Sequence, residues 1–140
     1  MLFDGEYVAP EKIENVYVQS PLVQQVYVDG DSLERYLIAI VVPIEKALGR
    51  LYKELHPDET EQKPFAEMCK DKLTLEHVLL DLQKLGKEQK LNSIEQAKKL
   101  YIEPEPFTLE NGLLTPTLKS KRPELRRKYK DIMQNLYKTE

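Results

Sequence analysis

Two apolar stretches in the first third of the chain have the composition of β-strands. Residues 22–28 and 36–42 are rich in β-branched and aromatic side chains, and Asp29-Gly30-Asp31 between them is a turn signal. This pattern predicts two antiparallel strands. Residues 36–42 lack the alternation of apolar and polar positions that marks a half-exposed strand, so we expect this strand in the middle of a sheet covered on both faces.

Much of the remaining chain has the spacing of amphipathic helices, with apolar residues three or four positions apart. Pro10 opens a short helix to about Val18, because the N–H that proline lacks would be unpaired in a first helical turn. Thr74 is the predicted N-cap of the strongest helix. Further helices are expected after Pro43 up to His56-Pro57, weakly at 65–70, and from Pro123 onward.

Shorter signals complete the predicted fold. Residues 93–96 match the capping-box pattern of a short helical turn, and residues 97–102 predict a third strand. Residues 1–8, with the turn signal Asp4-Gly5, predict a hairpin-like segment. The expected fold is therefore α+β, with a small antiparallel or mixed sheet of about three main strands packed on helices and a short N-terminal hairpin-like segment.

Composition limits the class of protein. The 140 residues allow one ordinary domain, which excludes a full-sized dehydrogenase, kinase or synthetase, and 41% hydrophobic with 32% charged residues predicts a globular chain. The longest apolar run, residues 36–44, is far shorter than the roughly 20 residues that span a bilayer, and no secretory signal is apparent. The single cysteine, Cys69, argues against a disulfide framework or a thiolate zinc site. We therefore expect an intracellular, cytoplasmic setting for this chain.

Charge is distributed unevenly. From Thr115 onward, eight Lys or Arg stand against three Asp or Glu, a net charge of +5, so the preceding residues sum to −8 within the overall −3. A basic end on an acidic body points to an anionic ligand or a complementary surface. A merely solvated helix face is the alternative.

Common catalytic patterns are missing from the chain. His56 and His77 lie in no Ser/His/Asp or HExxH arrangement, Cys69 has no CxxC partner, and the glycines form no phosphate-binding loop. A structural role is expected for each of these three residues, and no metal site is expected in the chain.

One basic segment remains, just before the predicted last helix. Its turn-forming residues favour a loop, from which Lys119, Lys121 and Arg122 project. Cations on a loop outside the core are suited to contact a polyanion. On this chemistry alone, phosphate binding and a solvated basic loop are equally open.

Three motifs carry a resemblance to a known family. The segment Leu-Thr-Pro-Thr-Leu-Lys-Ser-Lys-Arg-Pro-Glu-Leu at 114–125 resembles the last core motif of the adenylate-forming superfamily, in the variant of long-chain acyl-CoA synthetases. Gly-Glu-Tyr-Val at 5–8 with Glu-Lys-Ile-Glu at 11–14 is similar to the motif that opens that family's C-terminal lid, and 74–87 fits the long-chain subgroup. Ser120 and Pro116 depart from the general pattern, so the subgroup variant locates the family's lysine at Lys121.

The resemblance implies that residues 1–140 are the single C-terminal lid domain of an ATP-dependent long-chain fatty acid:CoA ligase, without its large N-terminal domain. Fatty acid, ATP and CoA would be the substrates, Mg²⁺ would be bound by the N-terminal domain, and the isolated fragment would be inactive. Lys121 would be the catalytic lysine of adenylation. Gly5, Glu6 and Tyr7 would line the CoA passage, with Lys119 and Arg122 as secondary phosphate contacts.

The rival reading is a free-standing interaction or RNA-binding module that uses the basic C-terminal segment. The chain lacks an aromatic RNP pattern and a GxxG loop, so no nucleic-acid partner is expected. An interaction surface for other subunits or a membrane stays open, as do acyl-chain length preference, oligomeric state and membrane attachment of the parent enzyme.

Overall fold

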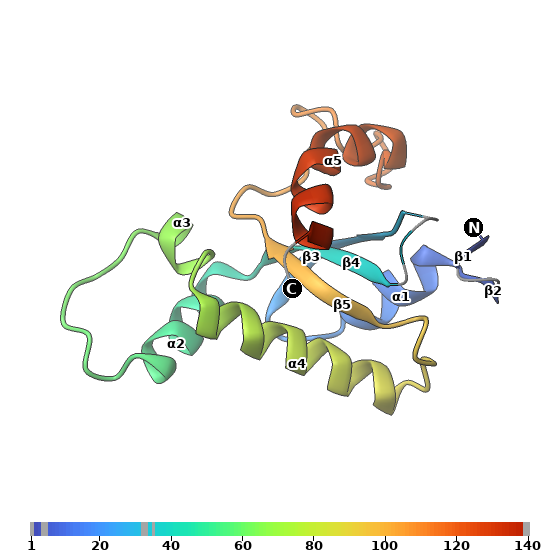
Figure 1. The fold of residues 1–140 in the computed structure, drawn as a ribbon. Coiled ribbons are helices and arrows are strands. Elements are labelled where there is room, and N and C mark those ends of the chain that lie inside the picture. Colours follow the sequence, from blue (N-terminus) through green and yellow to red (C-terminus); the bar gives the residue numbers. More distant parts are fainter. Residues whose placement is uncertain (1, 4–5, 32–33, 35, 139–140) are drawn as a thin grey trace.

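A three-stranded mixed sheet forms the centre of the computed structural model, which describes residues 2–3, 6–31, 34 and 36–138. The strand order is β3-β4-β5, with β3 antiparallel and β5 parallel to β4 (Figure 1). The strands are β3 (Val23–Asp29), β4 (Leu37–Pro43) and β5 (Ala97–Ile102). The predicted α+β class, the antiparallel pair and the third strand at 97–102 are confirmed.

The central strand β4 is buried at every position, as its sequence predicted. Leu37, Ala39 and Val41 contribute to a larger core cluster, whereas Ile38 and Ile40 contribute to a second cluster. Because successive side chains of a strand point to opposite faces, β4 separates two cores. This explains why the strand is apolar without alternation.

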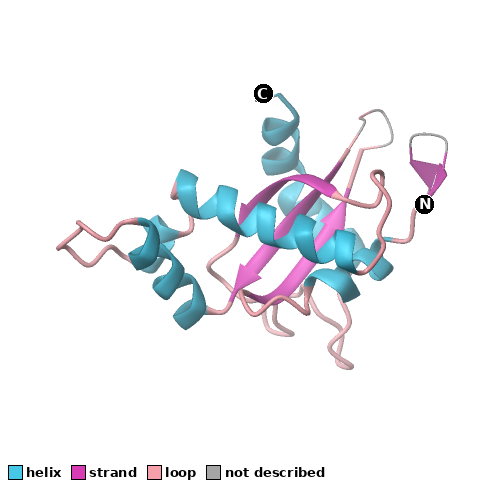
Figure 2. Ribbon diagram, turned by 90° about the horizontal axis from the view of Figure 1, so that it is seen from below, coloured by secondary structure: helices cyan, strands magenta, loops and turns pink. Residues whose placement is uncertain are grey.

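Helices cover both faces of the sheet (Figures 1 and 2). Leu125, Tyr129 and Met133 of the last helix pack in the second cluster, while the other helices contribute to the first. The helices are α1 (Pro10–Tyr17), α2 (Glu45–Leu55), α3 (Phe65–Met68), α4 (Lys72–Glu88) and α5 (Arg122–Lys138). All five correspond to predicted helices.

Two local predictions were wrong in register. The N-cap of α4 is Asp71, whose carboxylate accepts hydrogen bonds from the Thr74 N–H at 3.0 Å and the Thr74 hydroxyl at 2.8 Å. Thr74 is buried inside the first turn. The helix starts earlier because the Asp71 carboxylate caps the N–H of Thr74. The Thr74 hydroxyl donates to the same carboxylate and does not act as the N-cap.

The capping-box prediction for 93–96 is displaced by one residue. The Asn92 side chain accepts from the Glu95 N–H at 2.9 Å, and the Glu95 carboxylate accepts from the Asn92 N–H at 3.1 Å. A turn follows instead of a helix, because the next residue, Gln96, is drawn into the core. Its amide accepts from the Tyr17 hydroxyl at 2.7 Å and donates to the Gln83 carbonyl at 2.9 Å.

The N-terminal segment forms the predicted hairpin, in which β1 (Leu2–Phe3) pairs antiparallel with β2 (Glu6–Tyr7). The predicted turn at Asp4-Gly5 lies outside the described residues. In the described part of the chain, no helix combines the length and apolar character needed to cross a membrane.

Candidate active site

The basic segment before α5 is a compact hairpin, which we call the Lys121 hairpin and define as residues 113–121. The Thr115 N–H donates to the Lys119 carbonyl at 2.8 Å, and the Lys121 N–H donates to the Leu113 carbonyl at 2.9 Å. Leu113 and Leu114 are buried in the core cluster beneath α5. The predicted loop is therefore anchored to the core at its base.

The turn of the Lys121 hairpin has an unusual backbone. The Thr115 hydroxyl accepts from the Lys119 N–H at 3.1 Å and lies 3.0 Å from the Thr117 hydroxyl. Leu118 adopts a left-handed conformation with φ of +63° and is 73% exposed. Leucine rarely adopts this conformation, so the tip of the turn has a strained backbone and carries an exposed apolar side chain.

Lys119 and Lys121 are exposed, and within the described part of the chain neither ammonium group has a hydrogen-bond or ion-pair partner. The backbone of Lys121 is nevertheless fixed, because its carbonyl accepts the Leu125 N–H at 3.0 Å in addition to the bond from its own N–H. Lys121 thus combines a fixed base with a free side chain. It also lies at the N-terminal end of α5, where the helix dipole favours anions.

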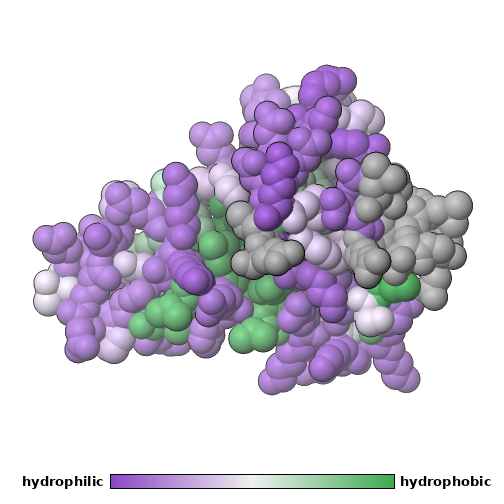
Figure 3. Space-filling view, in the orientation of Figure 1, coloured by the Kyte–Doolittle hydropathy of each residue, from purple (hydrophilic) through white to green (hydrophobic). Residues whose placement is uncertain are grey.

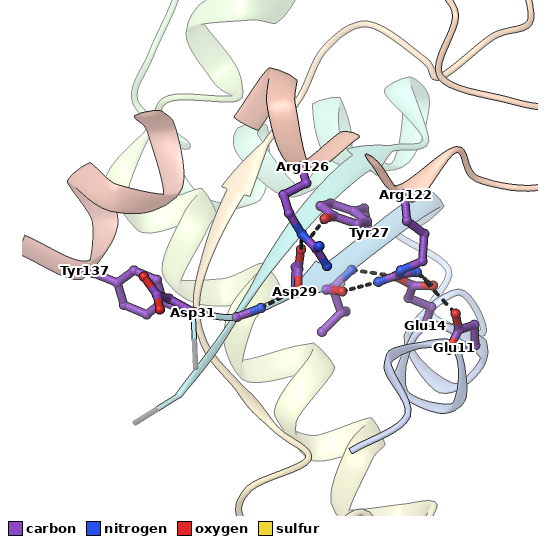
Figure 4. A network of polar contacts seen from close by, with 10 residues as sticks. Glu11, Glu14, Tyr27, Asp29, Asp31, Arg122, Arg126 and Tyr137 are labelled. Carbon is purple, nitrogen blue, oxygen red and sulfur yellow. Dashed lines mark hydrogen bonds and ion pairs between the residues drawn. The ribbon is translucent and has the colours of Figure 1, made fainter. Parts of the chain in front are cut away.

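Arg122 differs from its neighbours, because its guanidinium is used inside the protein (Figure 4). One nitrogen donates to both Glu14 carboxylate oxygens at 3.0 Å, and the other donates to the Val28 carbonyl at 2.6 Å. The guanidinium carbon lies 5.0 Å from the centre of the Tyr27 ring. The sequence predicted that Arg122 projects from the loop together with Lys119 and Lys121. In the structure its guanidinium is instead hydrogen-bonded within the domain.

Glu14 is mostly buried beneath this contact, with 13% of its side chain exposed. Burial raises the pKa of Glu14 above its ordinary value, while the Val28 N–H, which donates at 2.7 Å, and the Arg122 guanidinium oppose that rise. Glu11 lies on the outer side of the same guanidinium, 3.8 Å away. Arg122 thereby holds two acidic side chains of α1.

One turn further along α5, Arg126 makes a second contact with β3 (Figure 4). Its Nε donates to the Asp29 carboxylate at 2.9 Å, which raises the pKa of Arg126, and the Tyr27 hydroxyl donates to the same carboxylate. Tyr137, near the end of α5, accepts from the Asp31 N–H at 3.0 Å. These contacts fix α5 along β3.

A cleft of about 670 Å³ lies beside the Lys121 hairpin, between it, α1 and β3. Its surface is both polar and apolar, and Lys119 lines it while Lys121 does not. The lining residues include Glu11, Asn15, Val18, Gln24, Leu118 and Lys119.

The surface around α5 is mainly hydrophilic, whereas hydrophobic side chains reach the surface in the lower half of the same view, where α2 and α4 lie (Figure 3). Leu73 and Leu80 of α4 are exposed by 46% and 62%. The lysines of the Lys121 hairpin thus belong to the polar side of the molecule.

Of the other candidate residues, His56 and Cys69 have structural surroundings. His56 Nε2 lies 2.9 Å from the Asp71 carboxylate and its ring stacks near Tyr52, which ties the end of α2 to the start of α4. Burial raises the pKa of Cys69 to about 11, so this residue is a packed thiol. His77 is exposed on α4. In the described part of the chain, no three His, Cys, Asp or Glu side chains gather as metal ligands.

The first predicted segment, Gly5-Glu6-Tyr7, is only partly described: Gly5 lies outside the described residues, and Glu6–Tyr7 form β2. Val8 follows and is buried, and α1 begins at Pro10. The helix that carries Glu14 therefore starts directly after this segment. The Glu14–Arg122 contact had no signal in the sequence, because the two residues are 108 positions apart.

Comparisons with known proteins found related sequences that align with nearly the whole chain, whereas no family model matches it. It is 48% identical over 138 residues, 99% of this chain, to long-chain-fatty-acid–CoA ligase 5 of Mus musculus. Among solved structures, it is 35% identical to the adenylation domain of a carboxylate reductase from Mycobacterium chelonae, with a TM-score of 0.80 over 99% of this chain.

A second solved structure is the A domain of a carboxylic acid reductase from Segniliparus rugosus, in complex with AMP and a co-purified carboxylic acid. The chain is 35% identical to it, with a TM-score of 0.77 over 95% of this chain. This chain covers 20% of the mouse ligase and 19% and 18% of the two reductase chains. It therefore spans about a fifth of the length of the proteins it matches.

Proposed function

We propose that this chain, which is homologous along its whole length to the C-terminal part of long-chain-fatty-acid–CoA ligases, is the lid domain of such an ATP-dependent enzyme. Residues 1–140 form this one domain. The enzyme joins a fatty acid to CoA and converts ATP to AMP and pyrophosphate. The homology over nearly the entire chain favours this function over a free-standing RNA-binding module.

In the first half-reaction, a fatty-acid carboxylate oxygen attacks the α-phosphorus of ATP, and pyrophosphate leaves. Two anions must approach each other, so a preorganised cation between them stabilises the transition state. Lys121 supplies this cation. The observation that carries the assignment is its free, exposed ammonium group on a backbone that is hydrogen-bonded on both sides, at the N-terminal end of α5.

Lys119 is a secondary phosphate contact in this proposal, since its ammonium group is also exposed and unpaired within the described residues. Arg122, the other cation of the segment, is not available to a phosphate while it holds Glu14. Mg²⁺, ATP and the acyl chain are bound by the rest of the enzyme, so the lid by itself does not form acyl-CoA.

In the second half-reaction, the CoA thiol attacks the acyl carbonyl carbon of the acyl-AMP, and AMP leaves. The lid rotates between the two steps, and Gly5, Glu6 and Tyr7 then line the passage of the CoA thiol arm. The position of β2 directly before α1 supports this proposal, because both proposed functional segments then belong to one domain.

The test is Lys121→Ala in the full-length ligase. Acyl-AMP formation, followed as pyrophosphate release, should fall by a factor on the order of 10²–10³, as when one preorganised donor is removed. Thioester formation from synthetic acyl-AMP and CoA should stay near the wild-type rate, because it bypasses the step that needs the cation.

Lys119→Ala is the matched control, since it removes the same charge two residues away and should lower adenylation far less. If Lys119 is the sensitive position, the register of the motif is off by two residues. If Lys121→Ala slows both half-reactions equally, the assignment of Lys121 to one orientation of the lid fails.

A further inference from the structure

The side chain of Lys121 is free, so its position depends on how firmly its backbone is held. The next residue, Arg122, holds the backbone at this point. Arg122 makes three contacts with two other elements: with Glu14 on α1, and with the Val28 carbonyl and the Tyr27 ring on β3 (Figure 4). Only 22% of its side chain is exposed. The first residue of α5 is therefore held by contacts that do not depend on α5 itself.

The contacts around Val28 have a specific geometry. The Glu14 carboxylate accepts the Val28 N–H at 2.7 Å, and the Arg122 guanidinium donates to the Val28 carbonyl at 2.6 Å. β3 is an edge strand of the sheet, and within the described residues no further strand pairs with its outward peptide groups. The Glu14–Arg122 pair takes the place of that strand, so its position is set by the backbone of the sheet.

We infer that Arg122 and Glu14 are positioning residues for Lys121. Together they form a clamp that fixes the Lys121 backbone, from which the catalytic side chain extends. This inference rests on the proposed function of Lys121. The clamp also joins the start of α5, directly after the Lys121 hairpin, to α1, which begins three residues after β2. The adenylation and CoA segments therefore keep one geometry as the lid rotates.

A lysine in place of Arg122 would keep the charge but lose the clamp. The guanidinium has nitrogens aimed in fixed directions, and here one meets both Glu14 oxygens while the other meets the Val28 carbonyl. A lysine ammonium is a single point charge and cannot reproduce this planar arrangement. Arg122→Lys therefore changes geometry more than charge.

Arg126 provides the matched control. It lies one turn further along α5 and also pairs with a carboxylate, that of Asp29, at 2.9 Å. Its side chain is 63% exposed, and it is not adjacent to Lys121. Arg126→Lys thus makes the same chemical change in a pair that does not hold the base of Lys121.

The experiment is a double-mutant cycle in the full-length ligase, with pyrophosphate release as the readout and thermal denaturation to confirm folding. Arg122→Lys should lower the kcat of adenylation by about tenfold, and change the KM for ATP less than about twofold. In the Lys121→Ala background, the same substitution should cost less than about twofold, because nothing remains to be positioned. Arg126→Lys should cost less than about twofold in either background.

Glu14→Gln is the second variant, which breaks the pair from its other side and should show the same dependence on Lys121. If Arg122→Lys lowers adenylation equally with and without Lys121, or slows thioester formation from acyl-AMP as much, the clamp is only structural and the inference is wrong. If Lys121→Ala itself leaves adenylation unchanged, the proposed function fails and the inference fails with it. A full Lys121→Ala defect with a silent Arg122→Lys overturns the inference alone.

Discussion

The two faces of the β-sheet are stabilised in different ways. The face covered by α1, α2 and α4 buries mainly aliphatic side chains, such as Val78 and Leu82 of α4. The face covered by α5 has a smaller core, and adds directional contacts from Arg122 and Arg126 to the edge strand β3. Apolar burial is non-directional, so it gives stability, whereas ion pairs and hydrogen bonds with fixed geometry also set orientation.

The candidate active site lies on the second face. The Lys121 hairpin is anchored by its first two residues, Leu113 and Leu114, which are buried in the second core cluster. Arg122, which pairs with Glu14, follows its last residue. A catalytic cation must be held at a defined point, and polar contacts at its base can do this while leaving its side chain free. The comparison therefore predicts different consequences when each face is perturbed.

The largest loss of stability is expected from Leu82→Ala. Leu82 is fully buried in the aliphatic face, and its truncation should lower the free energy of unfolding by about 2–5 kcal/mol, from lost burial and the cavity that remains. Urea denaturation of the 140-residue chain measures the change. Leu80→Ala, on the same helix but 62% exposed, should cost less than about 0.5 kcal/mol. Similar losses for the two variants would contradict the assigned packing of α4.

A smaller loss is expected from removing one oxygen atom on the α5 face. The Tyr129 hydroxyl donates to the buried Glu103 carboxylate at 2.6 Å. Tyr129→Phe leaves the ring in place but removes that donor, which should lower the free energy of unfolding by about 1–3 kcal/mol. The readout is again urea denaturation.

Tyr101→Phe is the control for this prediction, because within the described residues the Tyr101 hydroxyl has no hydrogen-bond partner. It should change stability by less than about 0.5 kcal/mol. Equal effects of the two substitutions would show that the Tyr129–Glu103 hydrogen bond adds no measurable stability to the α5 face.

The smallest effect, of opposite sign, is expected at the tip of the Lys121 hairpin. Leu118 is exposed with a φ of +63°, a conformation that asparagine adopts more readily than leucine. Leu118→Asn should raise the free energy of unfolding by up to about 1 kcal/mol, measured as a higher midpoint of thermal denaturation. Leu109→Asn, at an exposed leucine without positive φ, should give no gain. A loss at Leu118 would mean that its side chain makes a stabilising contact.

Sequence patterns located the elements well where the signal is local. The apolar run in β4, the strand at 97–102 and the helix from Pro10 all appear where spacing and turn residues placed them. The two predictions that were wrong were also wrong only locally. Asp71 caps α4 instead of Thr74, and Asn92 pairs with Glu95 where the capping box was expected one residue later, since several neighbouring polar residues could serve each role.

The location of the candidate chemistry was also predictable, because a cluster of cations beside turn residues is visible without a structure. The sequence by itself could not tell which of these cations is free. The Lys121 ammonium group has no partner among the described residues, whereas the Arg122 guanidinium pairs with Glu14, 108 positions away. The charge of a side chain is a property of its residue type, but its availability depends on which distant segments the fold brings within hydrogen-bond reach. Only the packing of α1 and α5 against the edge of β3 decided that.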